Sequence, residues 1–354
     1  MKNLNKFINK SEDLPVDKFL NNVLYKKEHG YYSKKNPFGE SGDFITSPSI
    51  SFLFGEMLAI WIVSAWESLN KPKTFNLVEL GPGNGQLCNV MINTFKKFPL
   101  FFRSTNIFLY EKSEKLMKIQ KKKLNNKNIK WLSNLDKIKK GPVIFFGNEF
   151  FDAIPIKQFK KKGKIIFEKY IKIDNKMKIK KILKKAKDKD LKEIKKFKSF
   201  KKMNFFEYPK LGIKELDKII KVLKKTNGAL LLIDYGYLKP IQASTLQSVR
   251  KHKVNRLFDK IGEADITSLV NFGFLEEYFL TKDCDVKKVV SQSFFLKRIG
   301  ILNRAEILSS KMNFKEKSDL YMRLKRLLDP AQMGELFKVM CVQKNMKPFN
   351  LGFE

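Results

Sequence analysis

The chain places an acid and three glycines at alternate positions, in the order Glu79, Gly81, Gly83 and Gly85, with Pro82 inside the series. An apolar run comes just before the acid, so the series is expected to form the turn between a buried strand and the helix that follows it. Glycine tolerates positive φ and lets a ligand approach the backbone closely. The series is therefore typical of a turn that binds a nucleotide-like cofactor. The alternative is a tight turn whose glycines serve only packing.

A second acid stands where it could complete such a site. Glu111 directly follows the apolar run 107–110 and lies 26 positions after Gly85 (111 − 85 = 26). In a βαβ unit, an acid at the end of the second strand reaches the same crevice as the first turn, where its carboxylate accepts both ribose hydroxyls. The two features together predict a cofactor that carries a ribose.

The spacing of the glycines distinguishes two classes of cofactor. Dinucleotide-binding turns follow G-x-G-x-x-G and leave helix N-terminal amides free for a pyrophosphate. Counted from Gly81, the third glycine of that pattern would fall on Gln86. The observed series, in which an acid is followed by x-G-x-G-x-G, instead resembles motif I of the class I S-adenosylmethionine (SAM) methyltransferases. SAM carries no phosphate, so the missing third glycine is consistent with that cofactor.

Polar side chains also follow a later predicted strand, at 142–147. Asn148, Glu149 and Asp152 come soon after its end. Because ligands of a doubly wound sheet bind at the carboxyl ends of its strands, this turn is expected to face the same crevice as the glycine turn. Two acids and an amide there could hold an acceptor that is cationic or that donates hydrogen bonds. In the alternative, structural interpretation, Asp152 caps a helix and Glu149 pairs with a surface lysine.

The elements that must position these residues alternate along the chain. Hydrophobic periodicity predicts strands at 75–80, 106–111, 129–132, 142–147 and 229–234, and helices at 14–29, 49–69, 86–97, 113–124 and 212–225. Such alternation predicts an α/β fold with a mostly parallel, doubly wound, Rossmann-like sheet and right-handed crossovers. An added helical and loop lobe and an insertion account for the rest of the chain.

The length of 354 residues suggests one large α/β domain with a substantial additional part. We expect an N-terminal helical and loop region at 1–70 that contributes to the cofactor pocket. The core is expected at 71–160 and 204–354, with accessory C-terminal elements, and a lysine-rich insertion at 161–203. Within that insertion, short strands are predicted at 165–173, followed by helical or mobile charged segments.

The formal net charge of +36 raises the question of nucleic acid as a partner. Lysine supplies most of this charge and is spread along the chain, and its densest part, 176–202, contains only Phe197 and Phe200 as aromatics. Interleaved aromatic side chains that could stack on bases are therefore scarce. We interpret the stretch as a solvated face, with docking to an acidic partner and RNA binding as alternatives.

Other classes of protein are excluded by composition. Three cysteines and two histidines stand far apart without the spacing of a zinc site, so no metal is expected. The odd number of thiols without a disulfide pattern fits a reducing compartment. No apolar run approaches the roughly 18 residues that span a bilayer. With so few imidazoles, the chemistry must depend on carboxylates, amides and the cofactor.

Taken together, the motifs resemble those of the MidA-type (DUF185) SAM-dependent methyltransferases, a family that includes the mitochondrial complex I assembly factor that methylates arginine on the 49-kDa subunit. The ordered blocks that carry the resemblance are 30–32, 42–48, 54–56, 79–85, 148–155, 233–237, 245–247, 262–267 and 333–339. They extend over most of the chain and are more specific than motif I alone. The lysine-rich stretch departs from the family pattern, which puts the choice of partner in doubt but not the cofactor.

The resemblance implies roles for individual residues. The glycine turn (Glu79, Gly81, Pro82, Gly83, Gly85) would hold the methionine portion of SAM, and Glu111 would hold the ribose. Further cofactor contacts are implied for Asn148 and for Asp43, Thr46 and Ser47, which belong to a loop expected to close over SAM. Glu149, Asp152 and Asn148 are the candidate catalytic residues, because carboxylates that grip a guanidinium can orient one of its nitrogens.

The resemblance therefore implies a SAM-dependent protein arginine N-methyltransferase that acts on a complex I subunit during assembly and releases S-adenosylhomocysteine. An RNA methyltransferase and a non-catalytic SAM-binding assembly factor remain alternatives. Because the family blocks begin early in the sequence, the resemblance also implies a bacterial cytosolic member without a presequence. A homodimer is left open.

Overall fold

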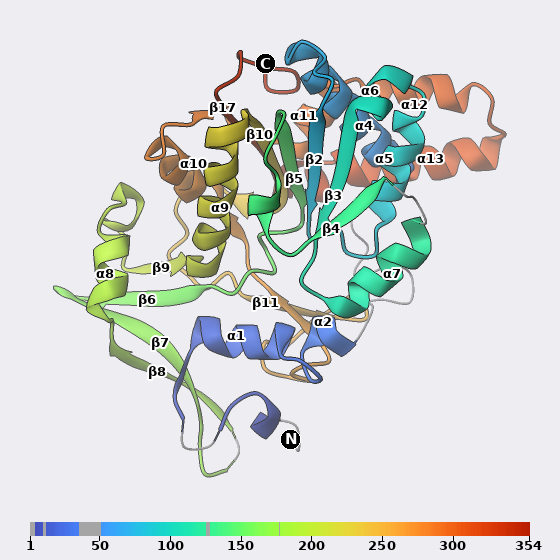
Figure 1. Ribbon diagram of the computed structural model, residues 1–354. Helices are drawn as coiled ribbons and strands as arrows, with labels where there is room; N and C mark the ends of the chain where they lie inside the picture. The colour runs from blue at the N-terminus through green and yellow to red at the C-terminus, as the bar shows by residue number, and fades with distance from the viewer. Residues whose placement is uncertain (1–3, 10–11, 35–50, 125–127, 177) are drawn as a thin grey trace. The chain divides into compact units, whose positions relative to one another are not determined.

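The computed structural model describes residues 4–9, 12–34, 51–124, 128–176 and 178–354 (Figure 1). Asp43, Thr46 and Ser47 lie outside these described residues. The chain divides into two compact units. Unit 1 comprises Met1–Phe44, Phe151–Asp217 and Tyr237–Tyr278, and unit 2 comprises Ile45–Phe150, Lys218–Gly236 and Phe279–Glu354.

Unit 2 is built on one large sheet whose main path has the strand order β15-β17-β10-β5-β2-β3-β4. The strands of this path are β2 (Phe75–Leu80), β3 (Thr105–Tyr110), β4 (Ile129–Leu132), β5 (Val143–Asn148), β10 (Gly228–Tyr237), β15 (Asp285–Val286) and β17 (Phe337–Lys344). Neighbouring strands from β4 to β10 run parallel, and β17 runs antiparallel to β10. The predicted mostly parallel sheet is thereby confirmed, with an antiparallel strand beyond β10.

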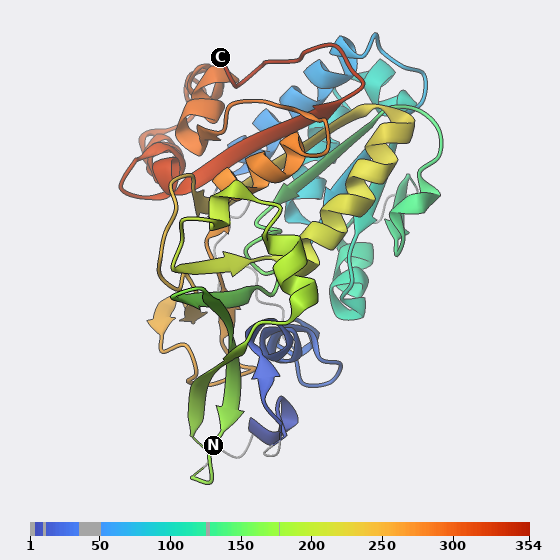
Figure 2. The same cartoon turned by 90° about the vertical axis from the view of Figure 1, so that its left-hand side faces the viewer.

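The strands of unit 2 are apolar, as a sheet covered by helices requires (Figure 2). Every residue of β2 is buried, as are nearly all residues of β10, which is typical of parallel strands covered on both faces. The helices that belong wholly to unit 2 are α4 (Phe52–Ser68), α5 (Gln86–Phe95), α6 (Pro99–Ser104), α7 (Glu114–Leu124), α11 (Gln292–Arg298), α12 (Ile301–Ser309), α13 (Phe314–Leu328) and α14 (Met333–Leu336). The Ser51 hydroxyl caps α4 by accepting the Leu53 N–H at 3.2 Å.

The order of the strands fixes where a ligand can bind in unit 2. The chain passes from β2 outward to β3 and β4, and then returns to β5 on the other side of β2. In the register, Glu79 of β2 pairs with Leu109 of β3 and with Phe146 of β5. The reversal makes the boundary between β2 and β5 the topological switch point, where the connections diverge and leave a crevice at the carboxyl ends of the strands.

Unit 1 contains an antiparallel sheet of order β1-β7-β6-β9, with β8 paired to β7. Its strands are β1 (Leu14–Pro15), β6 (Lys157–Lys162), β7 (Ile165–Ile173), β8 (Ile179–Lys185) and β9 (Phe205–Tyr208), and a smaller sheet comprises β11 (Gln247–Arg250), β12 (Lys253–Asn255) and β13 (Asp265–Thr267). Its helices are α1 (Val16–Tyr25), α2 (Tyr31–Lys34) and α8 (Asp188–Ile194), while α9 (Lys210–Thr226) and α10 (Phe272–Leu280) run from one unit into the other.

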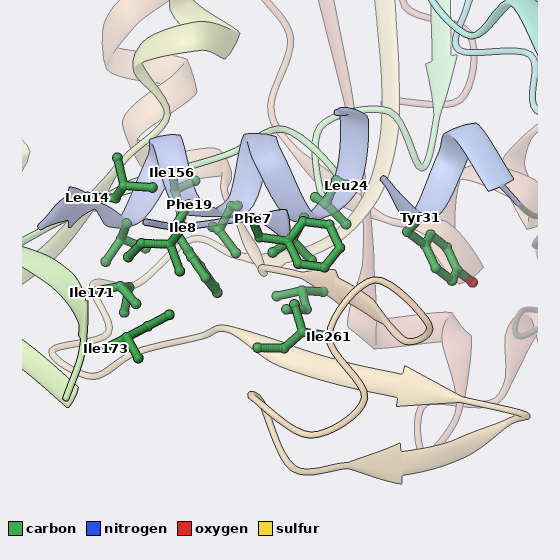
Figure 3. Packing of buried hydrophobic residues seen from close by; sticks show 14 residues of the cluster. Phe7, Ile8, Leu14, Phe19, Leu24, Tyr31, Ile156, Ile171, Ile173 and Ile261 are labelled. Carbon is green, nitrogen blue, oxygen red and sulfur yellow. The ribbon is translucent and has the colours of Figure 1, made fainter. Parts of the chain in front are cut away.

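A cluster of buried side chains forms the core of unit 1. Figure 3 shows Phe19 of α1 and Ile171 of β7 in one group with Phe7 and Ile261. Phe19 is fully buried and Ile171 is 2% exposed. The apolar side of α1, which its periodicity predicts, is therefore the side that packs against the sheet.

Within the stretch predicted as helical or mobile charged segments, Ile179–Lys185 instead forms strand β8, whereas Asp188–Ile194 forms helix α8. Lys184 of β8 pairs with Asp13 at 2.8 Å and lies 5.1 Å from the ring centre of Tyr170. Lys157 is buried against Glu168, at 2.5 Å. These lysines contact acids and aromatic rings of their own unit, in addition to solvent. Among the described residues, no helix combines the length and the apolar character needed to cross a membrane.

Candidate cofactor and acceptor site

The glycine turn lies at the carboxyl end of β2, at the switch point of the sheet. Gly81, Gly83 and Gly85 have φ values of 63°, 55° and 77°, so each adopts the left-handed conformation that glycine tolerates best. The turn is closed by the Gly85 N–H, which donates to the Pro82 carbonyl at 2.8 Å. A Cβ at Gly81 would lie 2.9 Å from Cδ2 of Phe150, so this position also lacks space for a side chain.

Glu111 lies at the end of β3 and faces the glycine turn through a shared partner, Gln120. The Gln120 Nε2 donates to the Gly83 carbonyl at 2.8 Å and to Glu111 Oε2 at 3.2 Å. Oε1 of Glu111 accepts the Ser113 N–H at 2.7 Å. Burial raises the pKa of the Glu111 carboxyl, and these hydrogen bonds counteract part of that shift. The acid and the turn are therefore on the same edge of the sheet, as their spacing predicts.

Gln120 joins the glycine turn to Glu111, and no sequence motif singled it out. Its Oε1 accepts the Trp131 Nε1–H at 2.9 Å, and its side chain is fully buried. The signal was present in the sequence, because Leu116, Gln120 and Leu124 recur at helical spacing and form the buried stripe of α7. An amide in an otherwise apolar stripe needs buried hydrogen-bond partners, and here the Gly83 carbonyl, Glu111 and Trp131 provide them.

Gln120→Leu is expected to weaken cofactor binding about tenfold and to lower the stability of the protein by about 2 kcal/mol, because it leaves buried polar groups without partners. Among these are the Gly83 carbonyl and the indole N–H of Trp131. Calorimetric titration with S-adenosylhomocysteine and thermal unfolding would measure both effects. Unchanged affinity in a destabilised variant would show that Gln120 supports the fold but not the site.

Glu79, the acid of the glycine series, is almost entirely buried at the end of β2. It is 4% exposed, and its Oε2 has no hydrogen-bond partner among the described residues. Burial raises the pKa of Glu79 to about 8, a hydrogen bond with the Cys88 thiol lowers it, and the nearby Glu111 carboxylate raises it further. In the ligand-free protein this carboxyl therefore carries a proton at neutral pH.

Asn148 and Glu149 lie at the end of β5, next to β2 across the switch point. The Asn148 Nδ2 donates to Glu149 Oε1 at 3.1 Å, whereas Asn148 Oδ1 is buried and has no hydrogen-bond partner among the described residues. Glu149 has a φ of 51°, a strained value for a residue other than glycine, and its N–H donates to the Ile233 carbonyl at 2.9 Å. Backbone strain of this kind is often found at functional sites.

Asp152, the third predicted catalytic residue, belongs to unit 1. It is 7% exposed, and its backbone carbonyl accepts the Ser268 N–H at 3.1 Å. The Asp152 carboxylate contributes to the raised pKa of Tyr32, whose main cause is burial. The Tyr32 hydroxyl donates to Asp265 at 2.8 Å in the same unit. The structure thus brings Glu79, the glycines, Glu111, Asn148 and Glu149 together in unit 2 and assigns Asp152 to unit 1.

The residues of unit 2 fit SAM. Gly81 and Gly83 are partly exposed and have no side chain, so a ligand can approach their backbone, and the Glu111 carboxylate suits a pair of ribose hydroxyls. Glu79 Oε2 and Asn148 Oδ1 are buried acceptors that lack a donor among the described residues. Buried polar atoms are nearly always satisfied, and the ammonium group of the methionine portion would supply donors. The pair of neighbouring carboxyl groups, Glu79 and Glu111, is also suited to a ligand with a net positive charge.

A sheet of this order, with a glycine turn at its switch point and an acid at the end of the neighbouring strand, is the fold of the class I methyltransferases. A family model described as "Putative S-adenosyl-L-methionine-dependent methyltransferase" matches residues 57–290. A crystal structure from Burkholderia thailandensis, which is bound to S-adenosyl-homocysteine, is similar with a TM-score of 0.82 and 21% sequence identity. The structural match covers 97% of this chain and 91% of the Burkholderia chain.

Two curated relatives match over nearly the same length. "Protein arginine methyltransferase NDUFAF7, mitochondrial" from Xenopus laevis is 30% identical, in an alignment that covers 93% of this chain and 80% of the relative. The protein of that name from Homo sapiens is 29% identical, over 92% of this chain and 78% of the relative. The chain therefore belongs to this family of SAM-dependent methyltransferases, as the sequence motifs predicted. It is an enzyme of that class, and SAM is its cofactor.

One expectation from the sequence is wrong. The resemblance was interpreted as that of a bacterial cytosolic member, whereas the curated relatives that match over most of the chain are named as mitochondrial proteins. The physical basis of that expectation was weak, because the family motifs report the cofactor site and carry no information on the compartment.

Proposed function

We propose that the chain is a protein arginine N-methyltransferase and that its substrate is a subunit of respiratory complex I, methylated during assembly. The observation that carries the proposal is the arrangement of Asn148 and Glu149 at the switch point, beside the SAM site. The printed name of the curated relatives, protein arginine methyltransferase, supports the same acceptor.

An arginine acceptor poses a particular chemical problem. The guanidinium is protonated in solution and its lone pairs are delocalised, so its nitrogens are poor nucleophiles. SAM, when bound, supplies an activated methyl group. The protein must therefore align one guanidinium nitrogen with the methyl carbon at roughly 3–3.5 Å and restrict its rotation.

Glu149 and Asn148 offer the groups that this task needs. The carboxylate of Glu149 pairs with guanidinium N–H groups and concentrates the positive charge away from the attacking nitrogen. Asn148 Oδ1 is a buried acceptor, and its Nδ2 is already engaged with Glu149. As the new N–C bond forms, the nitrogen loses a proton, and we assign its acceptance to the Glu149 carboxylate. Asp152, the other predicted catalytic carboxylate, belongs to unit 1, and its role stays a prediction.

The proposal is tested by incubating the protein with methyl-labelled SAM and complex I subunits, followed by acid hydrolysis and separation of the amino acids. Label in methylarginine is expected with the native enzyme and is expected to fall at least about 100-fold in the Glu149→Gln variant. Replacing each arginine of the labelled subunit by lysine would locate the acceptor. Label in lysine, or in RNA added to the same reaction, would overturn the choice of arginine.

A second measurement separates catalysis from docking. Glu111→Ala is expected to abolish cofactor binding, since we assign the ribose hydroxyls of SAM to the Glu111 carboxylate. If assembly of complex I then proceeds normally in cells that carry only this variant, the protein acts by docking, and the proposed catalytic role is wrong. The homodimer that the sequence left open stays a prediction, to be tested by analytical ultracentrifugation.

A further inference from the structure

One face of the antiparallel sheet of unit 1 carries lysines from three neighbouring strands. In this sheet β7 pairs with β6 on one side and with β8 on the other (Figure 1). Residues that are opposite one another in the register project to the same face, and so do residues two apart along a strand. The register therefore places on one face five lysines, which we call the basic face: Lys160 and Lys162 of β6, Lys169 of β7, and Lys181 and Lys185 of β8.

This side of the sheet is core at one end and surface at the other. Ile171 and Ile173 of β7 belong to the apolar cluster of unit 1, where Figure 3 shows them together with Phe19 of α1. The lysines of the basic face are exposed, except for Lys169, which is half-buried. The apolar end of this side thus holds unit 1 together, and the basic face is open to a partner.

The two sides of the sheet differ in how their lysines are paired. On the side opposite the basic face, Lys180 pairs with Asp174 at 3.4 Å and Lys184 pairs with Asp13 at 2.8 Å. No lysine of the basic face forms an ion pair with any of the residues that the structure describes. The basic face therefore carries charge that the described part of the protein does not compensate by ion pairs.

Glu207 of β9 is the one acid that the register places on the side of the basic face, among the residues of β6 to β9. It is 7% exposed, and its carboxylate is already engaged. Oε1 accepts Gln158 Nε2 at 2.7 Å and the Thr245 N–H at 3.1 Å, and Oε2 accepts the Thr245 hydroxyl at 2.5 Å. One buried carboxylate thus stands against five lysines.

Like charges lie close together on the basic face. Burial lowers the pKa of Lys169, and the ammonium groups of Lys181 and Lys160 lower it further, against an opposing effect of Glu207. Cations that repel one another without a matching set of acids favour an anionic partner, because its negative charges remove that repulsion.

Two phenylalanine rings on the same side do not favour nucleic acid as that partner. The ammonium group of Lys169 lies 4.5 Å from the ring centre of Phe205, and that of Lys162 lies 5.9 Å from the ring centre of Phe167. Phe205 is 8% exposed and Phe167 is half-buried. Bases stack on rings that are open to them. These rings instead support the lysines above them, so the basic face suits carboxylates better than bases.

We propose that the basic face binds an extended acidic segment of the protein that this enzyme methylates. Along an extended segment, side chains on one side recur every two residues, or about 6.8 Å. Lys181, Leu183 and Lys185 recur with that period on β8. A segment with acids opposite the two lysines and an apolar side chain opposite Leu183 matches them. This inference rests on the proposed protein substrate, and it concerns docking, not the chemical step.

Fluorescence anisotropy with a labelled peptide measures this docking without any methyl transfer. The probe repeats Glu-Ser-Val-Ser, which presents glutamate and valine on one side when extended, and the control peptide has glutamine in place of glutamate. We expect the native protein to bind the glutamate peptide at least about tenfold more tightly than the glutamine peptide, with a difference that shrinks as salt is added. Equal binding of the two peptides would overturn the proposal.

Two pairs of substitutions on β8 separate the basic face from the overall charge of the protein. Lys181→Gln with Lys185→Gln should weaken binding of the glutamate peptide about tenfold. Lys180→Gln with Lys184→Gln removes the same charge from the opposite side of the same strand and should change binding less than about twofold. Equal losses in the two double variants would mean that the lysines act only through net charge, for instance to keep an edge strand from pairing with other chains.

Lys160→Gln with Lys162→Gln provides an independent check from β6, and it should weaken binding of the same peptide. Thermal unfolding of each variant would confirm that the fold is kept. Two further probes test the choice of partner: a single-stranded polyuridine RNA and vesicles that contain phosphatidylserine. Tighter binding of either one than of the glutamate peptide would show that the partner is not an acidic protein segment.

Methylation assays connect the basic face with turnover. Lys181→Gln with Lys185→Gln should raise KM for the full-length protein substrate about tenfold and leave kcat unchanged, while a short arginine peptide without acids is methylated as by the native enzyme. The two proposals fail separately. Native enzyme that methylates arginine but ignores the glutamate peptide would overturn the docking, whereas peptide binding without arginine methylation would overturn the proposed function.

Discussion

Gly81→Ala is expected to weaken SAM and S-adenosylhomocysteine binding about 100-fold or more, which corresponds to about 2.7 kcal/mol. Two effects combine at this position. Its φ of 63° is unfavourable for alanine, and the added Cβ would lie 2.9 Å from Cδ2 of Phe150. Phe150 also lies close to Gly147, because a Cβ added at Gly147 would be 3.1 Å from the Cβ of Phe150. Either the Phe150 ring or the glycine turn must therefore shift to accept the methyl group. Calorimetric titration measures the loss.

Gly163→Ala separates the two effects. Gly163, between β6 and β7, has a φ of 56°, and a Cβ there would meet nothing within 4 Å. This control should cost about 1 kcal/mol of stability through backbone strain and leave cofactor affinity unchanged. In the double variant Gly81→Ala with Phe150→Ala, the clash is removed, so part of the affinity should return. Full affinity in Gly81→Ala alone would show that the turn does not contact the cofactor.

The positions of the glycine turn and of Glu111 in the fold could be predicted because their signals are local. The end of a buried strand is visible as the end of an apolar run, and parallel strands bring their carboxyl ends to one edge. Strands predicted at 75–80 and 129–132 are found as Phe75–Leu80 and Ile129–Leu132. The positions of Glu111 and Glu149 then follow, since each stands directly after or close to such an end.

The rest depends on contacts between distant parts of the chain. The partner of Gln120 across the site, Gly83, lies 37 positions away, so no local pattern reveals the pairing. In β8 the partly buried side chains recur with the spacing of a helix, at Ile179, Ile182 and Leu183. This segment forms a strand because it pairs with β7. Ile179 lies opposite Ile173 and packs against the apolar cluster of unit 1. Tertiary contacts override the local periodicity there.

Glu149→Gly is expected to remove methyltransferase activity while it leaves the protein at least as stable as the native form. The left-handed backbone of Glu149 costs about 1 kcal/mol or more, which glycine avoids, although glycine also gains entropy in the unfolded state. Loss of the carboxylate removes the group proposed to orient the acceptor, so kcat should fall at least about 100-fold. Activity that falls as stability is kept or gained is the pattern expected of a strained functional residue.

Glu28 provides the matched control, because it is an exposed glutamate with a φ of 73°. Glu28→Gly should relieve strain in the same way and leave kcat unchanged. Glu149→Gln, which keeps the side-chain shape and the strained backbone, should lose activity without any gain in stability, and should bind SAM within about threefold of the native affinity. The three variants together distinguish charge from strain. If Glu149→Gln retained full activity, the carboxylate would not act on the acceptor, and the strained backbone at this turn would have to serve the placement of Asn148 instead.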